Sequence, residues 1–526
     1  MWIMKKTIIY SFMIISLLFS GCSDTWNDHY VDNHEKETGL TVMELIKEDP
    51  ELSTFSRMIE IAGYSDLLNS SQTFTVWAPV NSALTEVDLS DKEEVARTIS
   101  NHLARFNNST ATPPTEGVKM INGKMHYFGQ DGISFGDMKI LSGDIIARNG
   151  LLHKIEEMIP YSYNFREYME THDNTTLIAR FLSRFDEMIY QSQIPGTAES
   201  LSTDTTLVSY NRLLQYPELG LGVIESEDSL FTMIVPTDLA WQKAYDEISP
   251  YFKTYNADPA KADSIQEVQT SLAIVSDLIF RTGLDNPLSM DSIISTSGSV
   301  IKSPSSYFRG MEEMEASNGR LFLANALNIN KKETFCKPIY IESEEQSGRT
   351  PAAGTTVYTR NVSTDNKFAN EISGQRYIEV SPTSSSRQPG ITFQIPNILA
   401  GEYDIYAVFV PASVSDPSNV NDSTRVQFAV MYQGENGRTQ TSSFNSSDFT
   451  TSGDEVTTIC VTRNFKFPVA NYYDRIWLMD PLNSENDRNI TTSIYISTNV
   501  NNSEFNENKF SRSFRIDRVY LVPSEN

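Results

Sequence analysis

FTVWAPVNSAL, residues 74–84, decides the expected fold of the first third of the chain. Side chains at positions 74–78 alternate between two faces, which predicts a short strand. Pro79 lacks the backbone donor that a continuing strand needs, so the strand should end there. Asn81 or Ser82 can then cap a helix, because a short side-chain oxygen accepts from the free amides of a first turn. The stretch therefore predicts a strand, a stop and a helix start in close succession.

A second stretch, DIIARNGLLHKIEEMIP at residues 144–160, closes the same region. Asn149 and Gly150 are a turn signal, apolar residues follow, and Pro160 ends the segment. Together the two stretches resemble the paired signatures of the fasciclin (FAS1) family. The resemblance implies an α+β module over residues 39–161, in a family that consists mainly of adhesion and binding modules.

His153 occupies the histidine position of the second signature. The resemblance implies that His153, with Leu151 and Leu152, can belong to an adhesive surface. The alternative is a structural histidine whose ring hydrogen-bonds the backbone near Asn81, and we favour this alternative because buried polar groups are nearly always paired.

A diverged second copy is predicted over residues 162–334. LFTMIVPTDLAW, residues 230–241, repeats the strand, the proline stop at Pro236 and the cap. ASNGRLFLANALNI, residues 316–329, repeats the closing turn with Asn318 and Gly319, and Phe322 takes the histidine position. We interpret this region as a second fasciclin module lengthened by insertions.

The composition changes near residue 335. Short alternating runs such as EYDIYAVFV and FRIDRVYLV are separated by Ser, Asn, Asp, Gly and Pro clusters. This spacing is typical of an antiparallel β-sandwich over residues 335–526. The runs resemble jelly-roll, galactose-binding-like modules, many of which bind carbohydrate. The predicted fold class is thus a multidomain chain with two α+β modules and an all-β sandwich.

The N-terminus resembles a bacterial lipoprotein leader. Two lysines precede an apolar core that is short for a membrane span, and Ser20 and Gly21 precede Cys22. The resemblance implies a signal peptide, residues 1–21, and lipidation of Cys22. Residues 22–38 read as an acidic tether that resembles surface-export signals of Bacteroidetes lipoproteins. We therefore expect an outer-membrane protein that is lipid-anchored and faces outward.

The net charge excludes some partners. Cleavage before Cys22 removes two lysines and no acidic residue, so the net charge falls from −26 to −28. Nucleic acid is not an expected partner, because phosphate binding needs a basic face. The remaining cysteines, Cys336 and Cys460, allow one disulfide at most, and free thiols are the favoured interpretation.

The sequence favours a protein without enzymatic activity. No histidine follows His172, and the chain has no HExxH, CxxC or phosphate-loop motif. Gly132, Ser134 and Gly136 match the G-x-S-x-G pattern of hydrolases. That pattern needs a buried strand before the serine and a helix after it, whereas a strand-like run follows here, so a hairpin is predicted.

Candidate ligand contacts lie in the last domain, where aromatic side chains stand beside amide and carboxylate groups. They are Asn471, Tyr472, Tyr473, Asp474 and Trp477. The alternative is that these aromatic residues are core. The acidic loop at residues 480–489 has oxygen ligands that suit calcium, but its spacing fits no EF-hand, so neither a metal nor a cofactor is predicted.

These observations predict a binding role at the cell surface. The expected ligand is a glycan or a protein, captured beside a nutrient-uptake system of the starch-utilisation type. The alternative function is that of a structural accessory subunit of an outer-membrane transporter. A hydrolase is a remote third alternative. Contact with the membrane is expected through the lipid alone.

Overall fold

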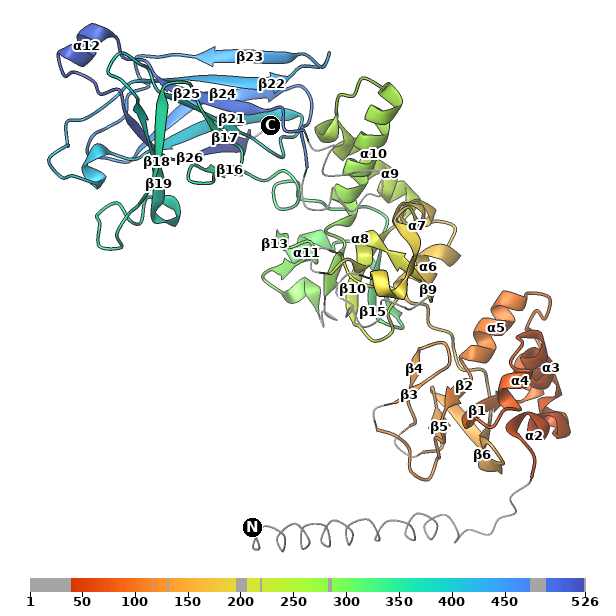
Figure 1. Ribbon diagram of the computed structural model, residues 1–526. Coiled ribbons are helices and arrows are strands. Elements are labelled where there is room, and N and C mark those ends of the chain that lie inside the picture. The colour runs from red at the N-terminus through yellow and green to blue at the C-terminus, as the bar shows by residue number, and fades with distance from the viewer. Residues whose placement is uncertain are drawn as a thin grey trace, which may run out of the picture. The chain divides into compact units, whose positions relative to one another are not determined.

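The computed structural model describes residues 39–115, 117–129, 132–194, 206–217, 220–281, 286–473 and 489–524. The chain forms two compact units, Met1–Ser162 and Tyr163–Asn526, and each is considered by itself (Figure 1). The predicted leader and tether, residues 1–38 with Cys22, lie outside the described residues. No helix in the described part of the chain is long and apolar enough to cross a bilayer.

The first unit is an α+β module in which short helices precede and cover a mixed sheet. Its helices are α2 (Val42–Glu48), η1 (Pro50–Leu52), α3 (Ser53–Ile61), α4 (Ser65–Leu68), η2 (Asn81–Leu84) and α5 (Lys92–Ser100). Its strands are β1 (Phe74–Pro79), β2 (Leu103–Arg105), β3 (Val118–Lys119), β4 (Met125–His126), β5 (Ser134–Phe135), β6 (Met138–Ala147) and β7 (Gly150–Ile155). The main sheet has the order β2-β1-β7-β6-β5, with β1 and β7 parallel.

Strand β1 is buried on both faces, although its sequence alternates. Phe74 and Val76 pack into the core beneath the helices, while Trp77 belongs to a second cluster on the opposite face. Trp77 stacks on Phe135 with ring centroids 4.0 Å apart. A central strand with both faces covered is typical of sheets whose parallel strands lie inside, so Trp77 is a core residue.

The second unit begins with a copy of this module. Its helices are α6 (Phe165–Thr171), α7 (Thr176–Ser183), η3 (Gln191–Gln193), α8 (Arg212–Gln215), α9 (Asp238–Ile248), η5 (Ser249–Phe252), α10 (Pro259–Val275), η6 (Pro287–Ser289) and α11 (Pro304–Tyr307). Its strands are β8 (Asp186–Tyr190), β9 (Leu207–Asn211), β10 (Phe231–Pro236), β11 (Ile279–Arg281), β12 (Ile293–Ile294), β13 (Val300–Ile301), β14 (Glu312–Ala316) and β15 (Gly319–Ala324).

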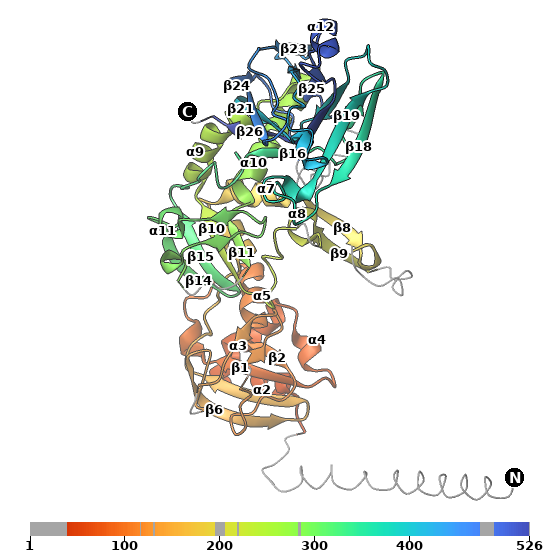
Figure 2. The same cartoon turned by 90° about the vertical axis from the view of Figure 1, so that its left-hand side faces the viewer.

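The order β11-β10-β15-β14 repeats β2-β1-β7-β6 of the first module. Phe231 pairs with Gly319 as Phe74 pairs with Gly150. Inserted residues contribute to the β8–β9 hairpin, visible in Figure 2. Helix α10 precedes β11 as α5 precedes β2, but it has 17 residues where α5 has 9.

The last third is a β-sandwich of two antiparallel sheets. The first sheet has the order β18-β19-β26-β21-β24, with β16 also paired to β26, and the second has the order β17-β20-β25-β22-β23. The strands are β16 (Ile339–Glu342), β17 (Arg349–Pro351), β18 (Thr355–Asn361), β19 (Arg376–Pro382), β20 (Gly390–Gln394), β21 (Gly401–Phe409), β22 (Val426–Gln433), β23 (Thr439–Phe444), β24 (Thr457–Phe467), β25 (Ser493–Thr498) and β26 (Phe514–Pro523). Short helical turns are η7 (Ser373–Gln375), η8 (Ala412–Val414) and α12 (Asn502–Asn506). The predicted fold class is confirmed.

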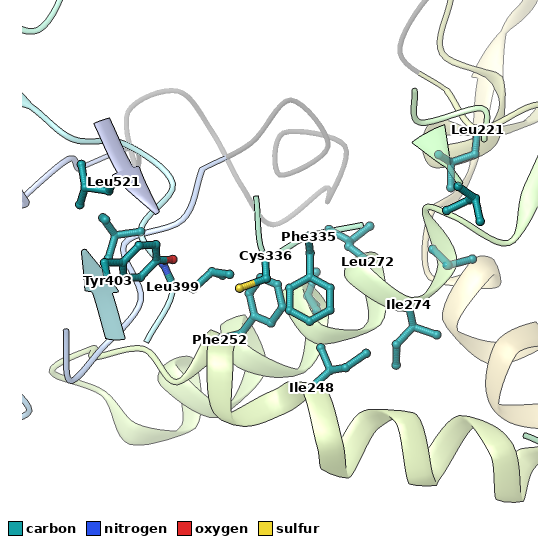
Figure 3. Packing of buried hydrophobic residues seen from close by; sticks show 14 of the residues in the cluster. Leu221, Ile248, Phe252, Leu272, Ile274, Phe335, Cys336, Leu399, Tyr403 and Leu521 are labelled. Atoms are coloured by element: carbon teal, nitrogen blue, oxygen red, sulfur yellow. The ribbon is translucent and has the colours of Figure 1, made fainter. Parts of the chain in front are cut away.

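The second module and the sandwich share one continuous hydrophobic core. Figure 3 shows Phe252, Phe335 and Cys336 between helices of the module and strands of the sandwich. Phe335 lies 5.6 Å from Phe252 between ring centroids. A backbone hydrogen bond also links the two domains: Ala400 N–H of the sandwich donates to the Tyr251 carbonyl of the second module at 2.8 Å. The sandwich is therefore fused to its neighbouring module by packing as well as by chain connection.

Candidate functional site

The signature asparagines hold the loop before each central strand. Asn149 Nδ2 donates to the carbonyls of Leu68 and Ser70 at 2.9 and 2.8 Å. Asn318 Nδ2 donates in the same way to Ile224 and Ser226 at 2.7 and 3.0 Å. Both residues are at most 5 % exposed. Both side-chain NH₂ groups donate to backbone carbonyls, so these asparagines have a structural role within the modules.

The signature glycines follow from close backbone contact. A Cβ on Gly150 would lie 1.8 Å from the Phe74 carbonyl oxygen, and one on Gly319 would lie 1.9 Å from the Phe231 oxygen. Both residues have positive φ, 149° and 146°. Only glycine allows the two parallel strands to approach in this way.

The predicted capping role of Asn81 is wrong. No side chain caps η2, and Asn81 Oδ1 instead accepts from the N–H of Thr54 in α3 at 2.9 Å. Asp238 does the same in the second module, where it accepts from Leu177 N–H at 2.8 Å. Pro79 and Pro236 end the parallel strands β1 and β10. The residue two positions after each proline therefore caps an earlier helix, which only tertiary contact can reveal. In the second module the predicted cap of the following helix is confirmed at Thr237, whose hydroxyl accepts from Ala240 N–H of α9 at 3.3 Å.

His153 is fully buried and neutral. Its Nδ1 accepts from Asp144 N–H at 3.1 Å, and its Nε2–H donates to the Asn108 carbonyl at 2.9 Å. Burial lowers the pKa of His153. The ring partners are thus Asn108 and Asp144 rather than the backbone near Asn81. Because the side chain has no exposed surface, it cannot contact a ligand of the folded module.

A second buried histidine, His102, predicts acid sensitivity of the first unit. Burial lowers the pKa of His102 to about 4 from its ordinary 6.5. The unfolded chain therefore binds a proton that the folded chain resists, and stability falls as the pH drops from 6.5 to 4. The loss amounts to about 3 kcal/mol for this group. Denaturant unfolding across this pH range measures it.

The variant His102→Gln should flatten that pH dependence while lowering stability at pH 7. Ile159 N–H loses its acceptor, His102 Nε2, which lies at 3.0 Å. His172→Gln, in the other unit, is the control and should leave the pH dependence of the first unit's unfolding free energy unchanged. An unaltered slope in His102→Gln would contradict the assignment.

The G-x-S-x-G match lies in a hairpin, as predicted. Ser134 belongs to β5, which pairs antiparallel with β6 through Ser134 and Lys139. A strand follows the serine, whereas a nucleophile elbow requires a helix. The geometry of this stretch does not support a hydrolase site.

The structure does not bring the predicted ligand contacts together in one site among the described residues. Asn471 is buried and its side chain bonds the backbone of Asn489 and Thr491, so it holds two loops together. Tyr472 packs edge-on against Phe252 of the second module, 5.3 Å between centroids. Tyr473 N–H donates to Asn397 at 2.9 Å. Asp474, Trp477 and the acidic segment 480–488 lie outside the described residues.

Sequence reasoning missed a row of tyrosines on the outer face of the first sandwich sheet. Tyr340 on β16, Tyr520 on β26 and Tyr406 on β21 are paired across neighbouring strands. Their rings stack, with centroids 5.8 Å apart for Tyr340–Tyr520 and 4.9 Å for Tyr520–Tyr406. Tyr340 is 55 % exposed. We call these three residues the tyrosine row.

Charged and polar groups flank the tyrosine row. The Arg518 guanidinium lies 5.6 Å from the Tyr340 ring centroid, within cation–π range. The hydroxyl of Tyr406 donates to the carboxylate of Asp404 at 3.3 Å. Burial raises the pKa of both Tyr406 and Tyr520, so these phenols keep their protons near neutral pH. The face thus combines aromatic surface with hydrogen-bond donors and acceptors.

Both remaining cysteines are free, as favoured from the sequence. Cys336 is buried at the junction of the second module and the sandwich, where burial raises the pKa of its thiol. Cys460 is half-buried on β24 and pairs in register with Tyr406.

One family model matches the first module, and several solved structures are similar to parts of the chain. Residues 50–160 match the family model described as "Fasciclin domain", so the first module is a fasciclin domain. The FAS1 domain pair of the insect cell adhesion molecule fasciclin I is similar, at 14 % identity and a TM-score of 0.20, covering 54 % of this chain and 98 % of that one. The CBM22-1 xylan-binding domain of Paenibacillus barcinonensis Xyn10C is similar at 12 % identity and a TM-score of 0.21, covering 36 % and 96 %. A family 35 carbohydrate-binding module of Clostridium thermocellum is similar at 10 % identity and a TM-score of 0.19, covering 36 % of this chain and 99 % of that one. No curated protein matches the chain.

Proposed function

We propose that this chain is a non-catalytic binding protein, anchored by lipid at Cys22 to the outer face of the outer membrane, whose β-sandwich captures a glycan. The observation that carries the proposal is the tyrosine row. Tyrosine combines an apolar ring with a polar tip, which suits ligands that are apolar on one side and hydroxylated on the other. Sugars have this character.

The charge of the chain favours a neutral glycan. A mature net charge of −28 repels polyanionic polymers at long range. Flanking Arg518 and Asp404 supply donors and acceptors of opposite charge, which suits hydroxyl groups. In this proposal the fasciclin modules act as spacer and scaffold, because their signature residues are occupied in internal contacts.

A protein ligand is the second candidate. Tyrosine and arginine are enriched at protein interfaces, and the exposed Tyr340 and its neighbour Arg518 would serve there as well. An accessory subunit of a nutrient-uptake transporter would use such a face for a permanent partner. Pull-down from native membranes separates the two functions, since only the accessory role requires a partner in fixed proportion.

Tyr520→Ala tests the glycan proposal. We expect roughly a 10- to 100-fold loss of affinity, the range for truncating an aromatic anchor. Affinity electrophoresis of the full chain through gels containing neutral polysaccharides measures it. Tyr127→Ala is the matched control, because Tyr127 is an exposed tyrosine of the first unit. Equal retention of Tyr520→Ala and wild type, or no retention of wild type by any polysaccharide, would overturn the proposal.

A further inference from the structure

A cavity of about 370 Å³ lies where the second module meets the sandwich. The module contributes Gln269, Asp277 and Ser299 to its lining, and the sandwich contributes Tyr340, Asn397 and Tyr472. Ligand pockets in proteins range from about 300 to 1,000 Å³, so this cavity suits one or two small rings. Neither domain alone forms it.

The acidic group of the cavity is buried and oriented. Asp277 is 3 % exposed, and its carboxylate accepts from the hydroxyls of Ser295 and Ser297, each at 2.7 Å. Lys337 also lines the cavity, its side chain is exposed, and its Nζ donates to Ser299 Oγ at 2.8 Å. One acidic and one basic group thus line the same space, each fixed by serine hydroxyls.

Gln269 on α10 has an unused donor. The residue is 4 % exposed, and its Nε2 has no hydrogen-bond partner among the described residues. A buried donor without a partner is costly, and native structures rarely keep one. Gln269 lines the cavity, and a rotation of its amide toward the cavity would offer this donor to an acceptor oxygen of a bound molecule.

Apolar residues also line the cavity. Phe252 and Leu272 are at most 3 % exposed, and Phe252 meets Tyr472 edge-on. Phe335 completes this side. The cavity therefore combines aromatic and aliphatic surface with fixed polar groups, as small-molecule sites do.

We infer that this cavity binds a single neutral sugar residue. The molecule must offer an acceptor to Gln269, a hydroxyl donor to Asp277 and an apolar side to Phe252. Because the acidic and basic groups balance, a neutral polyhydroxylated ring fits better than an ion. The class of ligand rests on the proposed glycan binding, whereas the site is separate from the centre of the tyrosine row.

The tyrosine row ends at this cavity. Tyr340 belongs both to the row and to the cavity lining. Its strand β16 pairs with β26 and with no other described strand, so Tyr340 is the last ring of the row. A glycan lying along the row would thus reach the cavity with its terminal residue.

Isothermal titration of the full chain with neutral monosaccharides (glucose, galactose, mannose and xylose) and their disaccharides tests the inference. At least one sugar should bind, and Gln269→Leu and Asp277→Asn should each weaken it about 10-fold, as for loss of one buried hydrogen bond. Gln242→Leu and Asp263→Asn, on exposed positions of α9 and α10, are the matched controls and should bind as wild type. Lys337→Met, at an exposed lysine, provides a further variant should a buried substitution unfold the unit.

The outcomes separate this site from the tyrosine row. Tyr520→Ala should weaken polysaccharide retention and leave monosaccharide binding unchanged, whereas the cavity variants should weaken monosaccharide binding. The inference is overturned if no sugar binds at concentrations up to about 10 mM. It is equally overturned if all three cavity variants bind as wild type, or if free amino acids bind and sugars do not.

Discussion

Gly150→Ala is expected to unfold the first module at temperatures where the second unit stays folded. The added Cβ would lie 1.8 Å from the Phe74 carbonyl oxygen, and both atoms belong to paired central strands. The strands must separate, which breaks the register from Phe74–Gly150 to Pro79–Ile155. We expect a loss of more than about 4 kcal/mol, in the exceptional range for one substitution. Circular dichroism during thermal or denaturant unfolding measures it.

Two further variants test whether this effect is specific to the close contact at Gly150. Gly39→Ala is the control, because no atom lies within 4 Å of a Cβ there, and its unfolding should match wild type within about 0.5 kcal/mol. Gly319→Ala should repeat the effect in the second unit, where the Phe231 oxygen lies 1.9 Å away. A Gly150→Ala protein with wild-type unfolding would disprove the close approach of β1 and β7.

Phe252→Ala should uncouple the second module from the sandwich. Phe252 belongs to the second module, is buried, and contacts Phe335 and Tyr472 across the junction. Removing a buried aromatic ring costs about 3–5 kcal/mol. Because this loss falls on the junction, the single cooperative transition expected for this unit should split into two. Differential scanning calorimetry detects the split.

Leu239→Ala is the matched control within the same unit. Leu239 is 79 % exposed on α9, so its truncation should change stability by less than about 0.5 kcal/mol. Two separate transitions in the wild-type protein would show that the shared core carries no cooperativity.

Local signals in the sequence predicted the architecture well. The strand-proline junctions and the Asn-Gly turns located the two parallel strand pairs, because each pattern needs only neighbouring residues. The assignment of Phe322 to the position of His153 also holds: Phe322 pairs with Ile234 as His153 pairs with Trp77. Alternating runs in the last third predicted the sandwich for the same local reason.

Residues whose roles depend on distant partners were predicted less well. Asn81 reaches back to Thr54, and Tyr472 packs on a helix of another module, so neither contact has a local signature. The tyrosine row had a partial signal, since Tyr340, Tyr406 and Tyr520 each occupy an outward position of an alternating strand. Its existence depends on the pairing of three strands that are far apart in the sequence, which alternation alone does not specify.

The shared core determines how the chain can be divided in the laboratory. A fragment that begins at residue 335 keeps the sandwich strands but leaves Phe335 and Tyr472 without Phe252, and it loses about half of the cavity lining. Newly exposed apolar surface of this kind favours aggregation. Expression trials should therefore cut the chain near Tyr163, where the second compact unit begins.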